Sequence, residues 1–316
     1  MTTRNILLCL GLLTPSDMDR LATKFEIVKL WEQPDPEAFL HQKGPEIRAI
    51  LSRFNGIHVT RVMMEAMPNL EIITQFGAGV DNIDLAAATD RQILVTNTPD
   101  EPTAATADLA MTLILTLLRR VVEADAFVRS GRWMSDTFGF GTDVGGKRLG
   151  IVGMGRLGQA IAKRAAAFDM QIAYHGPREK ADITYPYYAD ITRLAINSDI
   201  LVLSCPGGNE TRNLVGEKVL KALGPSGFLV NVARGSVVDF AALEQALDQN
   251  LIAGAALDVY PAEPCLPDAL VPRDNVVLVP HIGGRTHETR DKMSARVLEN
   301  LMAYAQGKKG LDLVKM

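Results

Sequence analysis

Short apolar runs alternate with amphipathic stretches along the first part of the chain. The runs predict strands, and apolar positions repeating every three to four residues between them predict helices. Asp35 and Pro36 supply a cap and a first-turn proline for one such helix, which ends near Gly44. This alternation is typical of βαβ units and a small parallel sheet. The predicted strands are Ile6 to Leu10, Ile47 to Leu51, Glu71 to Thr74 and Ile93 to Thr96.

A second alternating series follows a long predicted helix. Pro99 and Pro102 interrupt the chain, and Thr103 opens a helix rich in Ala and Leu that runs to about Arg120. We place a domain boundary here and expect a second sheet of about six parallel strands. Its predicted strands are Arg148 to Val152, Gln171 to Tyr174, Ile200 to Ser204, Phe228 to Asn231, Ala253 to Asp258 and Val276 to Val279, and a last helix, Thr286 to Gln306, follows them.

Two apolar segments need a check against membrane or export signals. Ile6 to Leu13 follows Arg4 and imitates a secretory signal, but the turn residues after it lack a small-residue cleavage pattern. We therefore interpret the segment as a buried strand. Leu109 to Leu118 has about half the length needed to cross a bilayer, which favours a buried helix. No membrane partner is expected.

Composition and charge narrow the class of protein. The chain has 316 residues, 47% hydrophobic and 22% charged, which is typical of a globular protein of about two domains. A net charge of −4 offers no polycationic surface, so nucleic acid is a poor candidate partner. Cys9, Cys205 and Cys265 are an odd number without C-x-x-C spacing, which argues against disulfides and a zinc site and favours a reducing, cytoplasmic compartment. We expect no metal.

A glycine-rich motif lies between a predicted strand and a predicted helix. Gly153-Met154-Gly155-Arg156-Leu157-Gly158 directly follows the strand Arg148 to Val152. The first glycine permits a tight turn, the second lets the backbone approach a pyrophosphate, and the third lets helix pack on strand. The N–H groups of the helix start then meet the anion. The motif predicts a dinucleotide site, although S-adenosylmethionine enzymes use similar loops.

The tip of the next predicted strand bears on the choice of cofactor. An acidic side chain there would bind the ribose 2′-hydroxyl of NAD. No acid stands near Gly176, whereas Arg178, Lys180 and the neighbouring His175 are suited to a 2′-phosphate. We therefore favour NADP over NAD. The alternative is that these are solvated loop charges and that Glu179 takes the ribose.

Three further segments place charged residues after predicted strands: Asn231 to Gly235, Asp258 to Pro264 and Pro280 to Gly284. With them, the chain resembles the D-isomer-specific 2-hydroxyacid dehydrogenases, which have an Arg, a Glu and a His in this order after the glycine motif. The resemblance covers almost the whole chain. It includes Gly77 to Asp84, Asn97 to Pro99 and Thr106 to Asp108.

The resemblance implies three catalytic residues. Arg234 would hold the substrate carboxylate and polarise the carbonyl, because its planar, permanently charged fork suits a 2-oxo acid. His281 would donate a proton to the carbonyl oxygen and take it back in oxidation. Glu263 would favour the imidazolium and fix its tautomer. Taken singly, these side chains are compatible with a helix cap, a surface charge and a core histidine.

The resemblance also implies binding residues around this centre. Gly77 to Gly79 would offer backbone donors to the substrate carboxylate, with Ala78 and Gly79 as contacts, although a plain turn explains the glycines equally well. The stretch from Cys205 and Pro206 to Thr211 departs from the family's usual Cys-Pro-Leu-Thr by a Gly-Gly pair after Pro206, and Cys205 is expected to pack rather than react. The implied cofactor contacts are Thr106, Gly153, Gly155, Arg156, Leu157, Gly158, His175, Gly176, Arg178, Cys205, Pro206, Thr211, Val232, Ala233, Asp258, Gly283 and Gly284.

The expected architecture is α/β, with two Rossmann-like doubly wound domains and an active-site cleft between them. Residues 1–99 with 286–316 would form a flavodoxin-like substrate domain, and residues 100–285 an NAD(P)-binding domain. The segment at Arg132 and Trp133 packs against a second subunit in relatives, so a homodimer is expected. The chain looks more like glyoxylate and hydroxypyruvate reductases than phosphoglycerate dehydrogenases. A dinucleotide-sensing binding protein and a methyltransferase are the alternatives from other classes.

Overall fold

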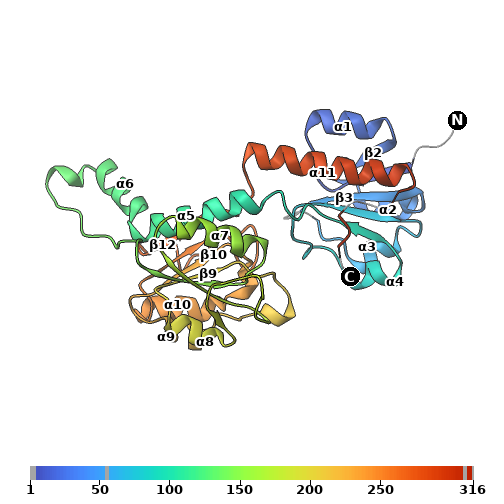
Figure 1. Cartoon of the computed structure of the whole chain (residues 1–316). Coiled ribbons are helices and arrows are strands. Elements are labelled where there is room, and N and C mark those ends of the chain that lie inside the picture. Colours follow the sequence, from blue (N-terminus) through green and yellow to red (C-terminus); the bar gives the residue numbers. More distant parts are fainter. Residues whose placement is uncertain (1–4, 54–56, 309–311, 315–316) are drawn as a thin grey trace. The chain divides into compact units, whose positions relative to one another are not determined.

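The computed structural model describes residues 5–53, 57–308 and 312–314 and separates into two compact units. The first unit contains the described residues up to Pro102 and those from Arg285 onward. The second unit runs from Thr103 to Gly284. Each unit is an α/β layer structure with its own parallel sheet (Figure 1).

The sheet of the first unit has five parallel strands in the order β2-β1-β3-β4-β5. This is the flavodoxin-like order. The sequence predicted four strands and missed β2, because its apolar residues alternate with Glu26 and Lys29 in an edge strand that is only half buried. β4 also begins and ends later than predicted. The strands are β1 (Asn5–Cys9), β2 (Phe25–Lys29), β3 (Ile47–Arg53), β4 (Ile72–Phe76) and β5 (Leu94–Thr96).

Helices cover both faces of this sheet (Figure 1). On one face, α1 (Pro15–Ala22) and the last helix, α11 (His287–Ala305), bury Leu21, Val297 and Leu301 against the strands. The other face carries α2 (Pro36–Lys43), α3 (Arg61–Glu65) and α4 (Leu85–Asp90). Asp35 caps α2 as predicted, because its side chain accepts the N–H of Ala38 at 3.0 Å. Short 3₁₀ turns span Leu30–Glu32 and Gly44–Glu46.

The sheet of the second unit has seven parallel strands in the order β12-β11-β10-β9-β6-β7-β8. Counted from β6, six of them follow the Rossmann order 3-2-1-4-5-6, and β12 adds a seventh at one edge. The prediction of about six strands missed β8, which is two residues long and has no apolar run. The strands are β6 (Arg148–Val152), β7 (Gln171–His175), β8 (Tyr187–Tyr188), β9 (Ile200–Leu203), β10 (Phe228–Asn231), β11 (Gly254–Leu257) and β12 (Val276–Leu278).

The helices of the second unit form a layer on each face of its sheet. α5 (Thr103–Leu118) and α7 (Arg156–Ala166) share one buried cluster with the sheet, and α8 (Ile191–Ile196), α9 (Glu217–Leu223) and α10 (Phe240–Asp248) share the other. α5 ends before Arg120, which has a left-handed backbone (φ +53°). α6 (Val121–Arg129) and the loop after it project from the body of the unit (Figure 1). Short 3₁₀ turns span Arg132–Met134, Asn209–Thr211 and Gly235–Val237.

The predicted fold class, two doubly wound parallel-sheet domains, is confirmed. Among the residues that the structure describes, no helix combines the length and the apolar character needed to cross a bilayer.

Candidate active site

The glycine motif forms a tight turn at the carboxyl end of β6, and its three glycines have different surroundings. Gly153 has φ +96°, and a Cβ there would lie 2.6 Å from the backbone nitrogen of Cys205. A Cβ on Gly158 would lie 2.1 Å from the carbonyl oxygen of Gly153. A Cβ on Gly155 would meet no protein atom within 4 Å. Because Gly155 also caps α7, it leaves an open cradle at a helix N-terminus, and this fits a pyrophosphate.

The loop after β9 supports this turn. The Ser204 hydroxyl donates to the carbonyl oxygen of Gly153 at 2.7 Å, a brace that the sequence did not reveal. Cys205 is buried, and burial raises the pKa of its thiol to about 11. A thiol that stays protonated is a poor nucleophile, which agrees with the packing role expected for Cys205. The Thr211 hydroxyl donates to the Pro206 carbonyl at 2.8 Å and so closes the loop.

The tip of β7 is held by its edge neighbour, β8. His175 Nδ1 lies 2.9 Å from the Tyr188 carbonyl oxygen, and because a carbonyl only accepts, Nδ1 carries the hydrogen. The Tyr187 hydroxyl donates to the Gly176 carbonyl at 3.0 Å. Arg178 and Glu179 follow, both with exposed side chains.

Arg234, Glu263 and His281 follow three neighbouring parallel strands, β10, β11 and β12. The carboxyl ends of parallel strands meet at one edge of a sheet, where open α/β sheets bind their ligands. Two contacts join the three loops. Gly235, next to Arg234, approaches the Tyr260 carbonyl so closely that a Cβ would lie 2.1 Å from its oxygen. The Tyr260 hydroxyl in turn donates to the Val279 carbonyl at 3.0 Å.

A histidine–carboxylate pair lies at this edge. His281 Nδ1 and Glu263 Oε2 are 2.5 Å apart, and their side chains are 20% and 14% exposed. The second carboxylate oxygen of Glu263 accepts the backbone N–H of Tyr260 at 2.9 Å. His281 has a left-handed backbone (φ +51°), a conformation that is uncommon outside glycine and is found at functional sites. The structure therefore brings together two of the three predicted catalytic side chains in direct contact.

Asp258 is buried beside this pair. Its carboxylate accepts the N–H groups of Ile282 at 2.6 Å and Gly283 at 3.0 Å, and only 1% of the residue is exposed. Burial raises the pKa of the Asp258 carboxyl to about 6. A Cβ on Gly283 would lie 3.2 Å from the Thr106 hydroxyl oxygen. Asp258, Gly283 and Thr106, three predicted cofactor contacts, therefore adjoin one another.

Asn231 shapes the Arg234 loop and was not singled out from the sequence. It is fully buried at the end of β10. Its side-chain oxygen accepts the N–H of Ala233, and its amide donates to the carbonyl of Arg234, both at 3.0 Å. The Arg234 guanidinium donates to the Ala233 carbonyl at 2.7 Å. A lone asparagine ending an apolar strand is the signal that could have indicated this role.

In the first unit, Gly77 to Gly79 form a loop directly after β4. The carbonyl oxygens of this loop accept hydrogen bonds from surrounding side chains and from the backbone. Asn97 donates its amide to the Ala78 carbonyl at 2.7 Å, and Gln75 donates to the Gly79 carbonyl at 3.1 Å. Ala78 is exposed, and its role as a substrate contact stays a prediction.

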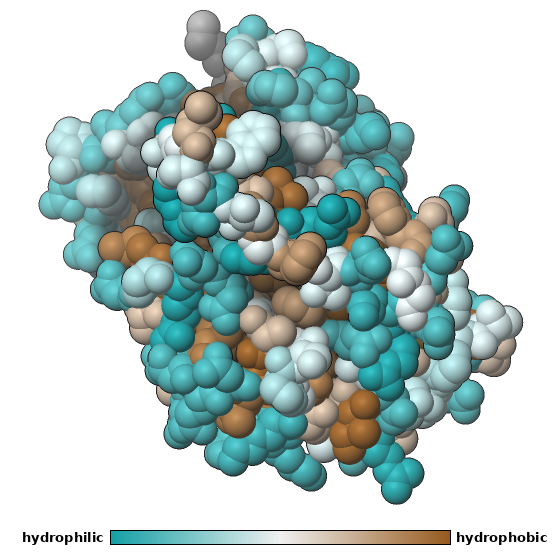
Figure 2. Space-filling model, turned by 90° about the vertical axis from the view of Figure 1, so that its left-hand side faces the viewer, coloured by the Kyte–Doolittle hydropathy of each residue, from teal (hydrophilic) through white to brown (hydrophobic). Residues whose placement is uncertain are grey.

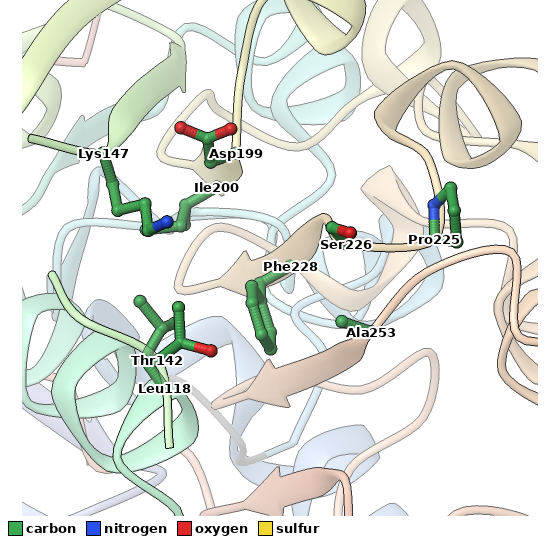
Figure 3. A pocket seen from close by; sticks show the side chains of 9 residues that line it. All are labelled: Leu118, Thr142, Lys147, Asp199, Ile200, Pro225, Ser226, Phe228 and Ala253. Atoms are coloured by element: carbon green, nitrogen blue, oxygen red, sulfur yellow. The ribbon is translucent and has the colours of Figure 1, made fainter. Parts of the chain in front are cut away.

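A pocket of about 400 Å³ lies at the opposite, amino-terminal edge of the second unit's sheet (Figure 3). Ile200 and Phe228 start β9 and β10 there, and Lys147 and Ala253 directly precede β6 and β11. None of the predicted site residues lines this pocket. The remaining predicted cofactor residues lie at the carboxyl edge: Arg156 and Leu157 at the start of α7, Val232 and Ala233 after β10, and Gly284 after β12.

Comparison with known proteins identifies relatives of this chain. Residues 111–283 match the family model for the NAD-binding domain of D-isomer-specific 2-hydroxyacid dehydrogenases. Glyoxylate/hydroxypyruvate reductase A of Arabidopsis thaliana is 43% identical over 92% of each chain. Hydroxyphenylpyruvate reductase of Plectranthus scutellarioides is 42% identical over 91% of this chain and 92% of its own length.

A solved structure extends the likeness to the whole fold. The NADPH-dependent glyoxylate/hydroxypyruvate reductase of Sinorhizobium meliloti, in complex with NADP and malonate, superimposes with a TM-score of 0.92. It is 38% identical and covers 99% of this chain and 97% of its own. The predicted family and the predicted class of enzyme, an NAD(P)-dependent oxidoreductase, are confirmed. By sequence and fold, the chain belongs to the D-isomer-specific 2-hydroxyacid dehydrogenase family.

Proposed function

We propose that the chain reduces a small 2-oxo acid of the glyoxylate or hydroxypyruvate type with NADPH. The observation that carries the proposal is the contact between His281 and Glu263 at the carboxyl edge of the sheet that also holds the glycine cradle. An imidazole paired with a carboxylate is suited to give and take a proton near neutral pH. When bound, the nicotinamide cofactor supplies the hydride.

Arg234 binds and orients the substrate in this proposal. Its guanidinium has a planar set of donors and keeps its charge, so it can hold a carboxylate and the adjacent carbonyl oxygen together. The Asn231 brace fixes the backbone on both sides of the Arg234 loop, which limits the directions that the guanidinium can take. Orientation of this kind lowers the barrier by fixing the reacting groups in advance.

His281 donates a proton to the carbonyl oxygen as that oxygen gains charge, and the carbonyl becomes an alcohol. Glu263 accepts the Nδ1 hydrogen, so the other ring nitrogen, Nε2, carries the transferable proton. The negative carboxylate also stabilises the imidazolium that must be present before transfer. In the oxidative direction the same nitrogen takes the proton back.

NADP is the cofactor we favour. The tip of β7 has no acid at Gly176 and offers His175, Arg178 and Lys180 to a 2′-phosphate. The Sinorhizobium relative is described as NADPH-dependent and was solved with NADP. NAD is the alternative, with Glu179 as the group that would receive the ribose.

The first experiment is NADPH oxidation followed at 340 nm with glyoxylate, hydroxypyruvate, pyruvate, phenylpyruvate and hydroxyphenylpyruvate. The series is repeated with NADH. We expect turnover of at least one small acid and a higher kcat/KM with NADPH. Preference for the aromatic acids would move the substrate toward that of the Plectranthus relative. Turnover of none of them, with NADPH still raising the melting temperature, would favour a dinucleotide-binding role without catalysis.

His281→Ala tests the catalytic assignment. Turnover is expected to fall by a factor of about 10² or more while NADPH binding is retained. His41→Ala is the matched control, because His41 is an exposed histidine on α2 in the first unit. Unchanged turnover in His281→Ala would contradict the assignment.

We also propose that the chain forms a homodimer through α6 and the loop that follows it. We call α6 and the following loop the arm. Its side chains Trp133, Met134 and Phe140 are 68%, 90% and 100% exposed, which is unusual for large apolar side chains in a monomer. Figure 2 views the molecule from the side of this arm and shows apolar side chains among polar ones. Sedimentation of the wild type and of the double variant Trp133→Ser/Phe140→Ser tests the proposal. A wild-type monomer would contradict it.

A further inference from the structure

Two tyrosine hydroxyls hold the loop at the tip of β7. Tyr187 of β8 pairs with Tyr174 of β7 across the sheet edge, and their ring centroids are 5.3 Å apart. The Tyr187 hydroxyl donates to the carbonyl oxygen of Gly176 at 3.0 Å. The Tyr174 hydroxyl accepts the backbone N–H of Lys180 at 2.9 Å. One hydroxyl therefore fixes the start of the segment Gly176 to Lys180, and the other fixes its end.

Burial makes these bonds effective anchors. Tyr174 is only 1% exposed and belongs to the core of the second unit, so its hydroxyl is fixed by packing. The Tyr174 hydroxyl loses solvation on burial, and its part-buried bond to the Lys180 amide compensates this loss. The Tyr188 carbonyl adds a third tie, to His175 Nδ1. The loop backbone is thus tied at its start to β8 and at its end to the core side chain of β7.

The position of this backbone determines where Arg178 can reach. Arg178 lies midway between the two anchors and has an exposed, long side chain. Binding is weaker when the loop that carries the guanidinium must be ordered first, because the entropy lost on ordering reduces the net affinity. A loop whose backbone is fixed beforehand avoids this loss. A ribose 2′-hydroxyl carries no charge and depends less on this placement.

We propose that Tyr187 and Tyr174 are positioning residues that set the preference for NADPH over NADH. The inference rests on the proposed use of NADP by this site. The two hydroxyls do not contact the cofactor in this proposal; they present Arg178 and the amide groups of its loop to the 2′-phosphate. Loss of either hydroxyl should therefore affect ligands that carry this phosphate more than ligands that lack it.

Calorimetric titration with two probes tests the inference without turnover. The probes are adenosine 2′,5′-bisphosphate and AMP, which differ only in the 2′-phosphate. For Tyr187→Phe, the affinity for the bisphosphate should fall about two- to tenfold, the contribution of one neutral hydrogen bond, and the affinity for AMP by less than about twofold. Tyr174→Phe should act in the same direction. The ratio of kcat/KM for NADPH and NADH should fall by the same factor.

Tyr188→Phe is the matched control. Tyr188 lies on the same strand but contributes its main-chain carbonyl to His175, so the substitution keeps that bond and should change neither affinity. Equal losses for both probes in Tyr187→Phe would show a merely structural role and overturn the inference. Unchanged affinities would also overturn it. A wild type that binds both probes equally would instead contradict the proposed NADP preference.

Discussion

His281 Nδ1 lies 2.5 Å from Glu263 Oε2, although 18 positions separate the two residues in the chain. The contact forms because the strands before them, β11 and β12, are neighbours and end at the same edge of the sheet. Tyr260 holds both partners: its backbone N–H binds the other oxygen of Glu263, and its hydroxyl binds the Val279 carbonyl just before His281. The carboxylate thus keeps one tautomer of the imidazole, with its reactive nitrogen directed away from the pair.

Glu263→Gln should lower kcat for the reduction by about ten- to hundredfold and leave NADPH affinity within about twofold of the wild type. Glutamine can still accept the Nδ1 hydrogen through its amide oxygen, but it places no negative charge opposite the ring that passes a proton to the carbonyl oxygen. Steady-state kinetics with glyoxylate and a fluorescence titration with NADPH measure the two effects, with Glu244→Gln as control. A kcat equal to that of the wild type would contradict the role given to Glu263.

Arg234→Lys should raise KM for the oxo acid about ten- to hundredfold and lower kcat as well. Lysine keeps the positive charge but replaces a planar fork by a point charge, so it cannot hold two oxygens in fixed geometry. Steady-state kinetics with glyoxylate and a fluorescence titration with NADPH separate the two sites. NADPH affinity should stay within about twofold of the wild type. Arg193→Lys on α8 is the control, and an equal KM in both variants would contradict substrate binding by Arg234.

Gly155→Ala should weaken NADPH binding without affecting folding, whereas Gly158→Ala should destabilise the fold. A methyl group on Gly155 meets no protein atom within 4 Å, so folding should be unaffected, with Tm changed by less than about 2 °C. It would occupy the cradle and lower NADPH affinity by about tenfold or more. A methyl group on Gly158 would lie 2.1 Å from the Gly153 carbonyl oxygen, and Tm should fall by more than about 5 °C. Thermal unfolding with and without NADPH measures both. A destabilised Gly155→Ala would contradict the open cradle.

Local patterns in the sequence predicted the parts of the site that depend on local geometry. The glycine turn after β6 follows from the steric needs of Gly153 and Gly158, which hold wherever a strand turns tightly into a helix. The strands β10, β11 and β12 are apolar runs, so the sequence placed their ends to within one residue and the charged residues after them.

Contacts between distant segments were not accessible in this way. β2 and β8 lie at sheet edges, where only one neighbour and partial burial are needed, so their sequences lack the apolar runs of central strands. Asn231 and Tyr260 support the site through hydrogen bonds to loop backbones. Such bonds depend on which strand ends meet in the sheet, and no spacing along the chain reports this. The left-handed backbone of His281 likewise arises from its turn after β12.

The buried carboxyl of Asp258 should make stability depend on pH. Its pKa is raised from 3.8 to about 6 in the folded chain, so the native state binds a proton more tightly than the unfolded chain. Stability from this group is full below about pH 4 and is lost as pH rises through about 6, by on the order of 3 kcal/mol. Asp258→Asn loses one of the two hydrogen bonds from backbone N–H groups at every pH. Its stability does not have the pH dependence that comes from the carboxyl group. Urea unfolding of both proteins from pH 4 to 7.5 measures the difference in stability, which should favour the wild type most at the acidic end and level off above about pH 7. A difference that grows in favour of the wild type with rising pH would contradict this prediction. It would mean that the hydrogen bonds from Ile282 and Gly283 lower the pKa of Asp258 by more than burial raises it.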